Sequence, residues 1–338
     1  MEYRWTCSGS EWCARPRSGN TRRSSSRAAA CLALAILFGC TDAGREIRAS
    51  SEAAAPVFAT EASRFAGGTI SDDRWQWRIT FTPDGNTAYF SISDAFFPAS
   101  RQATIVVSHR MPDGTWSRPE TAPFSGTHSD IDPFVTPDGK RLYFASIRPL
   151  NGTAKPDLDI FYVDRTADGW SEPVRLGREV NSDLDELYPS AAGDGTLYFG
   201  VGPFAPTPDA DWDIYHARRL GRGFAPRQPL ADINTDVPFQ PEDPTADWEF
   251  NPEISPDGQT LVFTSQRPGG FGRGDLYITH FDGARWSKPQ NLGPAVNTAN
   301  DEYHPTLSRD GKTLYFVRTS FRPGPEPGDF FHIRVIER

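Results

Sequence analysis

The stretch Asn297–Phe316, NTANDEYHPTLSRDGKTLYF, contains a pattern that recurs along the chain. A polar link and an acid lead into an apolar run, which ends at an Asp-Gly turn and resumes as Leu-Tyr-Phe. The turn glycines of the successive copies are Gly85, Gly139, Gly195, Gly258 and Gly311. The steps between them are 54, 56, 63 and 53 residues. A recurrence of this size is typical of repeat architectures, so the sequence predicts one structural unit used five times.

Each repeat contains four strand-like runs. The first ends at the turn, where glycine accepts a positive φ, and the second is the Leu-Tyr-Phe run. The third runs open with Asp159, Asp213, Asp275 and Asp329, which we interpret as structural. The fourth runs follow the aromatic residues Trp116, Trp170, Phe224 and Trp286. Four antiparallel strands per repeat predict the blades of an all-β propeller.

The two ends of the chain decide how the ring closes. The last repeat stops after its third strand, in residues 329–338, and therefore lacks a fourth. Near the start, Pro56-Val-Phe58 aligns with Pro173-Val-Arg175 of an inner repeat. We therefore expect an N-terminal strand to complete the last blade, which removes an exposed sheet edge. This arrangement gives five blades. Six is the alternative if the longest step, 195–258, hides degenerate strands.

Charge and cysteine content exclude several classes of function. The net charge of −9 is the sum of +4 in residues 1–40 and −13 in the rest. An acidic domain lacks the clustered Lys and Arg that bind phosphates, so we expect no nucleic-acid partner. All four cysteines lie within residues 1–40, so the repeats contain neither a disulfide nor a thiolate metal site.

The N-terminal segment has the features of an export signal. Arg22, Arg23 and Arg27 precede an apolar run, 28–39, that is too short to span a bilayer. The run ends in Leu37-Phe-Gly-Cys40, which resembles the lipobox of bacterial lipoproteins, where the cysteine is lipidated. Thr41 follows the cysteine instead of Asp, which by the same resemblance favours the outer membrane.

These features divide the chain into three parts. We expect a signal peptide with a lipobox in residues 1–40, a flexible tether in residues 41–55 and a propeller in residues 56–338. The propeller would face the periplasm. Its contact with the membrane would be through the lipid on Cys40 alone.

The repeat also resembles a known family. The core Asp301-Glu-x-x-Pro-x-x-Ser-x-Asp-Gly-x-x-Leu-Tyr-Phe316, the link Ser265–Gly270 and the segment Trp286-Ser-Lys-Pro289 resemble the TolB-like β-propeller repeat of bacterial envelope proteins. The resemblance covers residues 56–338. It implies the propeller fold, whereas the functions of the family range from binding scaffolds to enzymes.

The candidate site residues lie on the face of the disc opposite the Asp-Gly turns, which we call the link face. Nine positions before each turn glycine stand Gln76, Asp130, Glu186, Glu249 and Glu302. Two positions later stand Arg78, Asp132, Tyr188, Asn251 and His304. In a closed ring these residues would surround the mouth of the central channel. The ligand-binding set predicted from this placement is Gln76, Trp77, Asp130, Arg148, Glu186, Tyr188, Glu249, Arg267, Glu302, Tyr303 and His304.

The acids have a structural interpretation and three functional ones. Structurally, each accepts backbone N–H groups or pairs with an arginine such as Arg148 or Arg267, whereas Glu186 and Glu302 have no arginine at the equivalent position. Functionally, clustered carboxylates could hold the cofactor Ca²⁺, which prefers several oxygen ligands. They could also receive a basic peptide beside aromatic residues such as Tyr303. A third possibility is a carboxylate pair that cleaves a glycosidic bond, since crowding raises a carboxyl pKa.

No catalytic motif or phosphate-binding loop occurs in the sequence. We therefore expect a monomeric, envelope-anchored binding or scaffold module, not an enzyme, for a peptide, a glycan or a partner protein. The alternative is a carbohydrate-active hydrolase or lyase with Glu186, Glu302 and His304 as its candidate catalytic residues.

Overall fold

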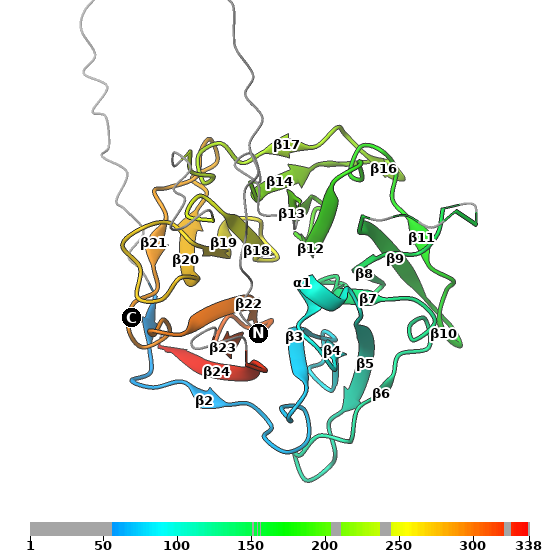
Figure 1. Cartoon of the computed structure of the whole chain (residues 1–338), viewed down its shortest axis with the longest axis horizontal. Coiled ribbons are helices and arrows are strands. Elements are labelled where there is room, and N and C mark those ends of the chain that lie inside the picture. Colours follow the sequence, from blue (N-terminus) through cyan, green and yellow to red (C-terminus); the bar gives the residue numbers. More distant parts are fainter. Residues whose placement is uncertain are drawn as a thin grey trace, which may run out of the picture. The chain divides into compact units, whose positions relative to one another are not determined.

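Five antiparallel sheets stand around a common centre, and the first strand of each sheet lies innermost (Figure 1). The computed structural model describes residues 56–150, 152–153, 155, 157–203, 211–236, 245–320 and 326–336. The predicted signal peptide, Cys40 and the tether lie outside the described residues. No helix in the described part is long and apolar enough to cross a membrane.

Within each blade the strands are given from the centre outwards. Blade I consists of β3 (Trp75–Phe81), β4 (Thr87–Ser93), β5 (Thr104–His109) and β6 (Glu120–Thr121). Blade II consists of β7 (Asp130–Val135), β8 (Arg141–Ser146) and β9 (Asp159–Thr166), and both β10 (Gly169–Trp170) and β11 (Val174–Arg175) pair with β9. Blade III consists of β12 (Asp185–Ala191), β13 (Leu197–Gly202), β14 (Asp213–Ala217) and β17 (Gln228–Pro229). Blade IV consists of β18 (Glu249–Ile254), β19 (Thr260–Ser265), β20 (Asp275–His280) and β21 (Gln290–Asn291). Blade V consists of β22 (Asp301–Leu307), β23 (Thr313–Thr319) and β24 (Asp329–Ile336), and both β1 (Val57–Phe58) and β2 (Ser63–Arg64) pair with β24. A small hairpin, β15 (Arg219–Leu220) with β16 (Gly223–Phe224), extends blade III, and a short helix, α1 (Phe97–Ser100), follows β4.

The N-terminal segment closes the ring, as predicted. Strand β24 pairs antiparallel with β1, where Val57 faces Ile336, and with β2, where Ser63 faces His332. The edge of the last blade is therefore covered by residues from the opposite end of the described chain. The ring has five blades, so the six-bladed alternative is wrong.

The Asp-Gly turns have the conformation that their sequence requires. Their five glycines have φ between 69° and 85°, a region that residues with a side chain rarely adopt. The aspartate before each glycine holds the turn; Asp138 accepts hydrogen bonds from the Thr136 hydroxyl (2.7 Å) and the Lys140 N–H (3.0 Å). Turns from four blades line one cavity, which confirms that they share a face of the disc.

Every innermost strand contains a β-bulge at the second position after its repeated acid or amide, which is Gln76, Asp130, Glu186, Glu249 or Glu302. In blades II to V the bulged residue has φ between 52° and 60° and is followed by proline; these residues are Asp132, Tyr188, Asn251 and His304. Proline has no N–H for the ladder, so it fits where the pairing is already broken. The bulges turn these side chains toward the centre, where they meet.

The Leu-Tyr-Phe runs form the core between neighbouring sheets. The phenylalanines of the second strands are completely buried: Phe90, Phe144, Phe199, Phe263 and Phe316. Each buried phenylalanine stabilises the fold by about 1.5–3 kcal/mol. A rigid core of this kind holds the two ends of the ring in place, and the site residues lie at those ends.

Candidate functional site

The repeated acids lie at the link ends of the innermost strands, and each is bonded within its own blade. Glu249 accepts hydrogen bonds from the Thr235 N–H (2.6 Å), the Ser265 hydroxyl (2.6 Å) and Arg267 (3.1 Å). Asp130 pairs with Arg148 at 2.9 Å. The predicted pairing of these acids with Arg148 and Arg267 is confirmed.

Glu186 and Glu302 also have arginine partners, from positions that are not equivalent in sequence. Arg227 lies 2.7 Å from Glu186, and Arg318 lies 2.7 Å from Glu302. The guanidinium of Arg318 stands 5.4 Å over the ring of Phe316, much as other blades place an arginine over the same phenylalanine. Period-2 alternation along β23 puts positions 316 and 318 on one face, a signal that sequence reasoning missed.

The electrostatics of these acids are those of a structural network. Burial raises the pKa values of Asp130, Glu186, Glu249 and Glu302, and the hydrogen bonds and arginines oppose that rise. None of the four side chains is exposed. Each of the four carboxylates accepts from a guanidinium group; the three glutamates also accept from a backbone N–H, and Asp130 accepts from the Ser125 hydroxyl. The acids therefore do not form an open cluster. The binding role predicted for them stays a prediction.

The other link-face candidates lie in an apolar cluster. Trp77, Tyr188 and Tyr303 pack with Trp75 and Phe97 and are less than 9% exposed. The indole rings of Trp75 and Trp77 stack at 5.6 Å. The amide of Gln76, which is completely buried, donates to the backbone and carboxylate of Asp72. Among the described residues these side chains close the link end of the ring.

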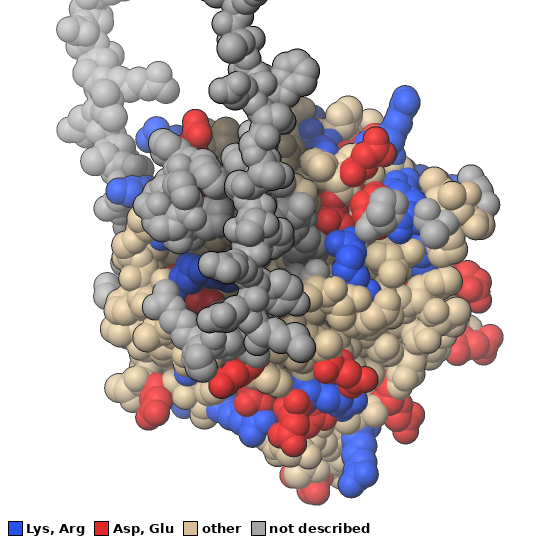
Figure 2. Space-filling model, in the orientation of Figure 1, with Lys and Arg blue, Asp and Glu red and all other residues tan. Residues whose placement is uncertain are grey.

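The surface around this end carries charges of both signs. Figure 2 shows Lys and Arg side chains interspersed with Asp and Glu, with no broad patch of one sign on the described surface in view. Within the described ranges, no three His, Cys, Asp or Glu side chains are placed to hold a metal ion. The Ca²⁺ site suggested by the repeated acids stays a prediction.

The five bulge-position residues form a buried polar group on the axis of the ring, here called the axial cluster: Arg78, Asp132, Tyr188, Asn251 and His304. The Asn251 side chain bonds both the backbone N–H (3.2 Å) and the ring Nδ1 (3.1 Å) of His304. The same ring nitrogen lies 3.5 Å from Asp132. Strands far apart in sequence therefore bring one polar residue each to a single point.

Arg78 is the charged centre of this region. Its guanidinium is completely buried and donates to Glu253 (2.5 Å) and to the Pro252 carbonyl (3.2 Å). Burial raises the pKa of Glu253 and that of Asp132 to about 7, and the charge of Arg78 opposes both shifts. Burial and the same charge lower the pKa of His304 well below its usual value. One cation thus faces two carboxyls that protonate near neutral pH.

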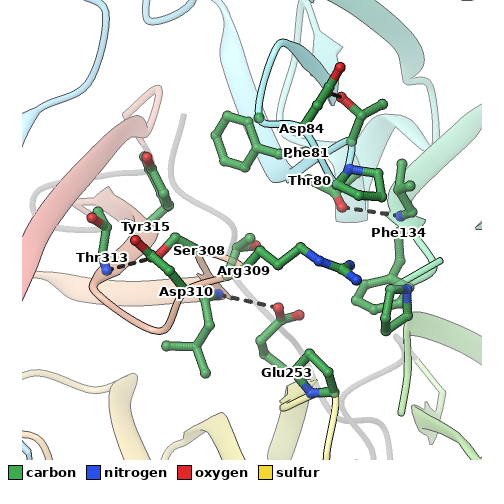
Figure 3. A pocket seen from close by; sticks show the side chains of 18 of the residues that line it. Thr80, Phe81, Asp84, Phe134, Glu253, Ser308, Arg309, Asp310, Thr313 and Tyr315 are labelled. Atoms are coloured by element: carbon green, nitrogen blue, oxygen red, sulfur yellow. Dashed lines mark hydrogen bonds between the residues drawn. The ribbon is translucent and has the colours of Figure 1, made fainter. Parts of the chain in front are cut away.

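A cavity of about 740 Å³ opens on the turn face above Arg78 and Glu253. We call it the turn funnel. Figure 3 shows Glu253 among the side chains that line it and Arg309 extending toward Phe134. Its wall includes four half-buried aromatic side chains: Phe65, Phe81, Trp116 and Tyr315.

Two arginines at the rim of the funnel, Arg110 and Arg309, are exposed and have no ion-pair partner among the described residues. Sequence reasoning did not identify this site. One signal was present: Arg309 replaces the proline that precedes Asp-Gly in blades I, II and IV. The remaining funnel residues come from separate repeats and become neighbours only in the closed ring.

Comparison with known proteins gives likenesses of low identity. The sequence matches no protein-family model and no curated protein. TolB from Acinetobacter baumannii is 16% identical over 78% of this chain and 55% of its own, with a TM-score of 0.44, so this chain spans about half of TolB. The endo-arabinase from Bacteroides thetaiotaomicron VPI-5482 is 15% identical, over 83% and 98%, with a TM-score of 0.49. The xylan β-1,4-xylosidase from Bacillus halodurans C-125 is 12% identical, over 81% and 55%, also at 0.49. The five-bladed propeller itself is defined by the strand order of this chain.

Proposed function

We propose that this chain is a binding module of the TolB-like type and that its ligand enters the turn funnel. The observation that carries the proposal is a single cavity that combines half-buried aromatic rings with the unpaired Arg110 and Arg309. Ligand sites are usually concave and combine apolar walls with polar groups that orient the ligand, and the funnel has both kinds of lining. The proposal moves the ligand from the link face to the turn face.

The matched tyrosines of two repeats provide the test. Tyr315 lines the funnel, whereas Tyr198, its equivalent in blade III, lines a different cavity. In a thermal-shift screen of Ca²⁺, peptides and envelope oligosaccharides, a ligand that binds the folded protein raises its melting temperature. We expect Tyr315→Ala to abolish that rise and Tyr198→Ala to retain it. A rise lost in Glu186→Gln but kept in Tyr315→Ala would return the site to the link face.

A specific observation also favours a second function, hydrolysis of a glycan. Glu253 lines the funnel and has a pKa of about 7, which suits a general acid at neutral pH. Burial also raises the pKa of Asp132 to about 7, but Asp132 is completely buried and does not line the funnel, so the second carboxyl of such a reaction would have to be another residue. Release of reducing ends from oligosaccharides, lost in a folded Glu253→Gln variant, would establish this function. Binding without turnover would exclude it for the glycans tested.

We further propose that the protein is a monomer held in the bacterial envelope by a lipid on Cys40, with the propeller facing the periplasm. The support is the lipobox-like segment Leu37–Cys40. Replacing Cys40 with serine removes the acceptor thiol and should release the protein from the membrane fraction. Unchanged fractionation of Cys40→Ser would contradict the anchor but leave the funnel proposal intact.

A further inference from the structure

We infer that the turn funnel recognises a peptide carboxylate with an apolar side chain next to it. This inference rests on the proposed function and names the chemistry of its ligand. It follows from three properties of the funnel: the residue that departs from the repeat, the shape of the aromatic wall, and the presence of hydrogen-bond donors that have no partner among the described residues.

The charge expected of the ligand follows from which polar side chains of the funnel have no partner among the described residues. Asp84 and Asp310 each accept hydrogen bonds within their own turn, as do the equivalent aspartates of other blades. Glu253 is held by Arg78 and by the Leu307 N–H. These acids therefore have structural partners.

Arg309 does not belong to that repeated scheme. It stands where blades I, II and IV have proline, and its side chain extends into the funnel (Figure 3). With Arg110 it supplies two guanidinium groups that have no ion pair among the described residues. A guanidinium binds a carboxylate with two parallel hydrogen bonds, so the geometry favours an anionic ligand group.

The aromatic wall of the funnel determines which kind of chemical group can lie beside the ligand's carboxylate. Phe65 meets Tyr315 at 5.0 Å and 79°, and Phe81 at 6.1 Å and 86°. Phe81 meets Tyr315 at 4.8 Å and 46°. Rings set at such angles form a corner, which fits a branched apolar side chain better than a flat sugar ring, since a sugar ring needs a broad ring face. The wall therefore favours a peptide over a glycan.

The same kind of aromatic notch between blades III and IV supplies a contrast. It contains Tyr198 and Trp286, which are 8% and 9% exposed and line a cavity of about 570 Å³. In the funnel the equivalent Tyr315 and Trp116 are only half-buried. Both notches have an exposed arginine with no ion pair among the described residues, Arg218 in the notch between blades III and IV and Arg309 in the funnel. The funnel therefore differs from its counterpart in the exposure of its aromatic rings.

Two further donors reinforce the preference for an acceptor. No hydrogen-bond partner for the Trp116 indole N–H or the Tyr315 hydroxyl occurs in the described parts of the chain. Together with Arg110 and Arg309 they give the funnel four side chains whose donor groups have no partner among the described residues. A carboxylate, which only accepts hydrogen bonds, can bind to such donors.

The test uses two peptides that differ in one group. Isothermal titration of the purified chain with N-acetyl-Ala-Leu, as the free acid and as the C-terminal amide, isolates the carboxylate. We expect the acid to bind at least about tenfold more tightly than the amide, with weakening as salt increases. Arg309→Ala should remove the preference. Arg222→Ala, at the exposed β15–β16 turn, should keep it.

The outcomes separate this inference from the proposal on which it rests. Equal binding of acid and amide, or binding of a uronate oligosaccharide with no binding of peptides, would overturn the peptide-carboxylate inference. The funnel would still be a ligand site if Tyr315→Ala abolished that binding. Absence of binding by the acid, the amide and the oligosaccharide, with the variants folded by their melting temperatures, would overturn both.

Discussion

Replacing Arg78 with methionine should strongly destabilise the protein at alkaline pH and much less at acidic pH. Arg78 is completely buried and is 2.5 Å from Glu253, whose carboxyl is also almost completely buried. Removing one partner of a buried ion pair typically costs about 3–5 kcal/mol, because the other charge stays in a poorly solvated position. For a domain whose free energy of unfolding is about 5–15 kcal/mol, this is a large fraction.

The pH dependence follows from the carboxyls. Burial raises the pKa of Glu253 from its ordinary 4.5 to about 7, and that of Asp132 also to about 7, with Arg78 opposing both shifts. Without Arg78 both carboxyls should bind protons at still higher pH. Near pH 5.5 they are neutral, so the loss should shrink to the roughly 1–2 kcal/mol of the missing hydrogen bonds.

Urea unfolding of Arg78→Met and the unaltered protein at about pH 8 and about pH 5.5 measures both losses. The double variant Arg78→Met/Glu253→Gln removes the stranded carboxyl, which destabilises the fold at pH 8 either as a buried charge or by binding a proton that the unfolded state has lost, and should recover part of the loss at pH 8. An equal loss at the two pH values, or no recovery in the double variant, would refute the electrostatic reasoning. The cost would then be one of packing alone.

Three further predictions concern the rest of the fold. In the unaltered protein the folded state retains the Glu253 proton that the unfolded state loses above about pH 4.5. The stability gained from this bound proton is therefore present at low pH and is lost as pH rises through 7. Urea titrations from pH 5 to 8 measure the resulting fall in the free energy of unfolding. Glu302→Ala leaves Arg318 without its partner and should cost about 2–4 kcal/mol by denaturant unfolding; a loss below about 0.5 kcal/mol would show the network to be unimportant. Deleting residues 56–64 removes β1 and β2 and exposes β24, so the melting temperature should fall and light scattering should show self-association; a monomer of unchanged melting temperature would contradict the closure role.

Much of the fold could be read from the sequence because its information is local. The missing fourth strand of the last repeat and the match at Pro56–Phe58 predicted the pairing with β24 that closes the ring. The arginine partners were predictable only in part. Arg148 and Arg267 follow the repeat, whereas Arg227 and Arg318 reach equivalent places in space from other positions in sequence.

The candidate ligand site was harder to predict from the sequence, because residues that recur in every repeat are easier to recognise than a residue that departs from the repeat. The acids that recur at the link face proved to be bonded within their blades, whereas Arg309, on the turn face, departs from its repeat. A residue type used in nearly every blade is the one that the shared architecture requires. The funnel is recognisable only when the departures from the repeat are mapped on one face.

By itself, the sequence determined the blade, its turns and the closure of the ring, because strand alternation and turn chemistry depend on residues close together in the chain. The tertiary structure decided which end of the ring is filled and which is open. That outcome depends on the combined volumes and charges of side chains such as Trp77, Arg78 and Tyr315, which the closure of the ring brings together from different blades.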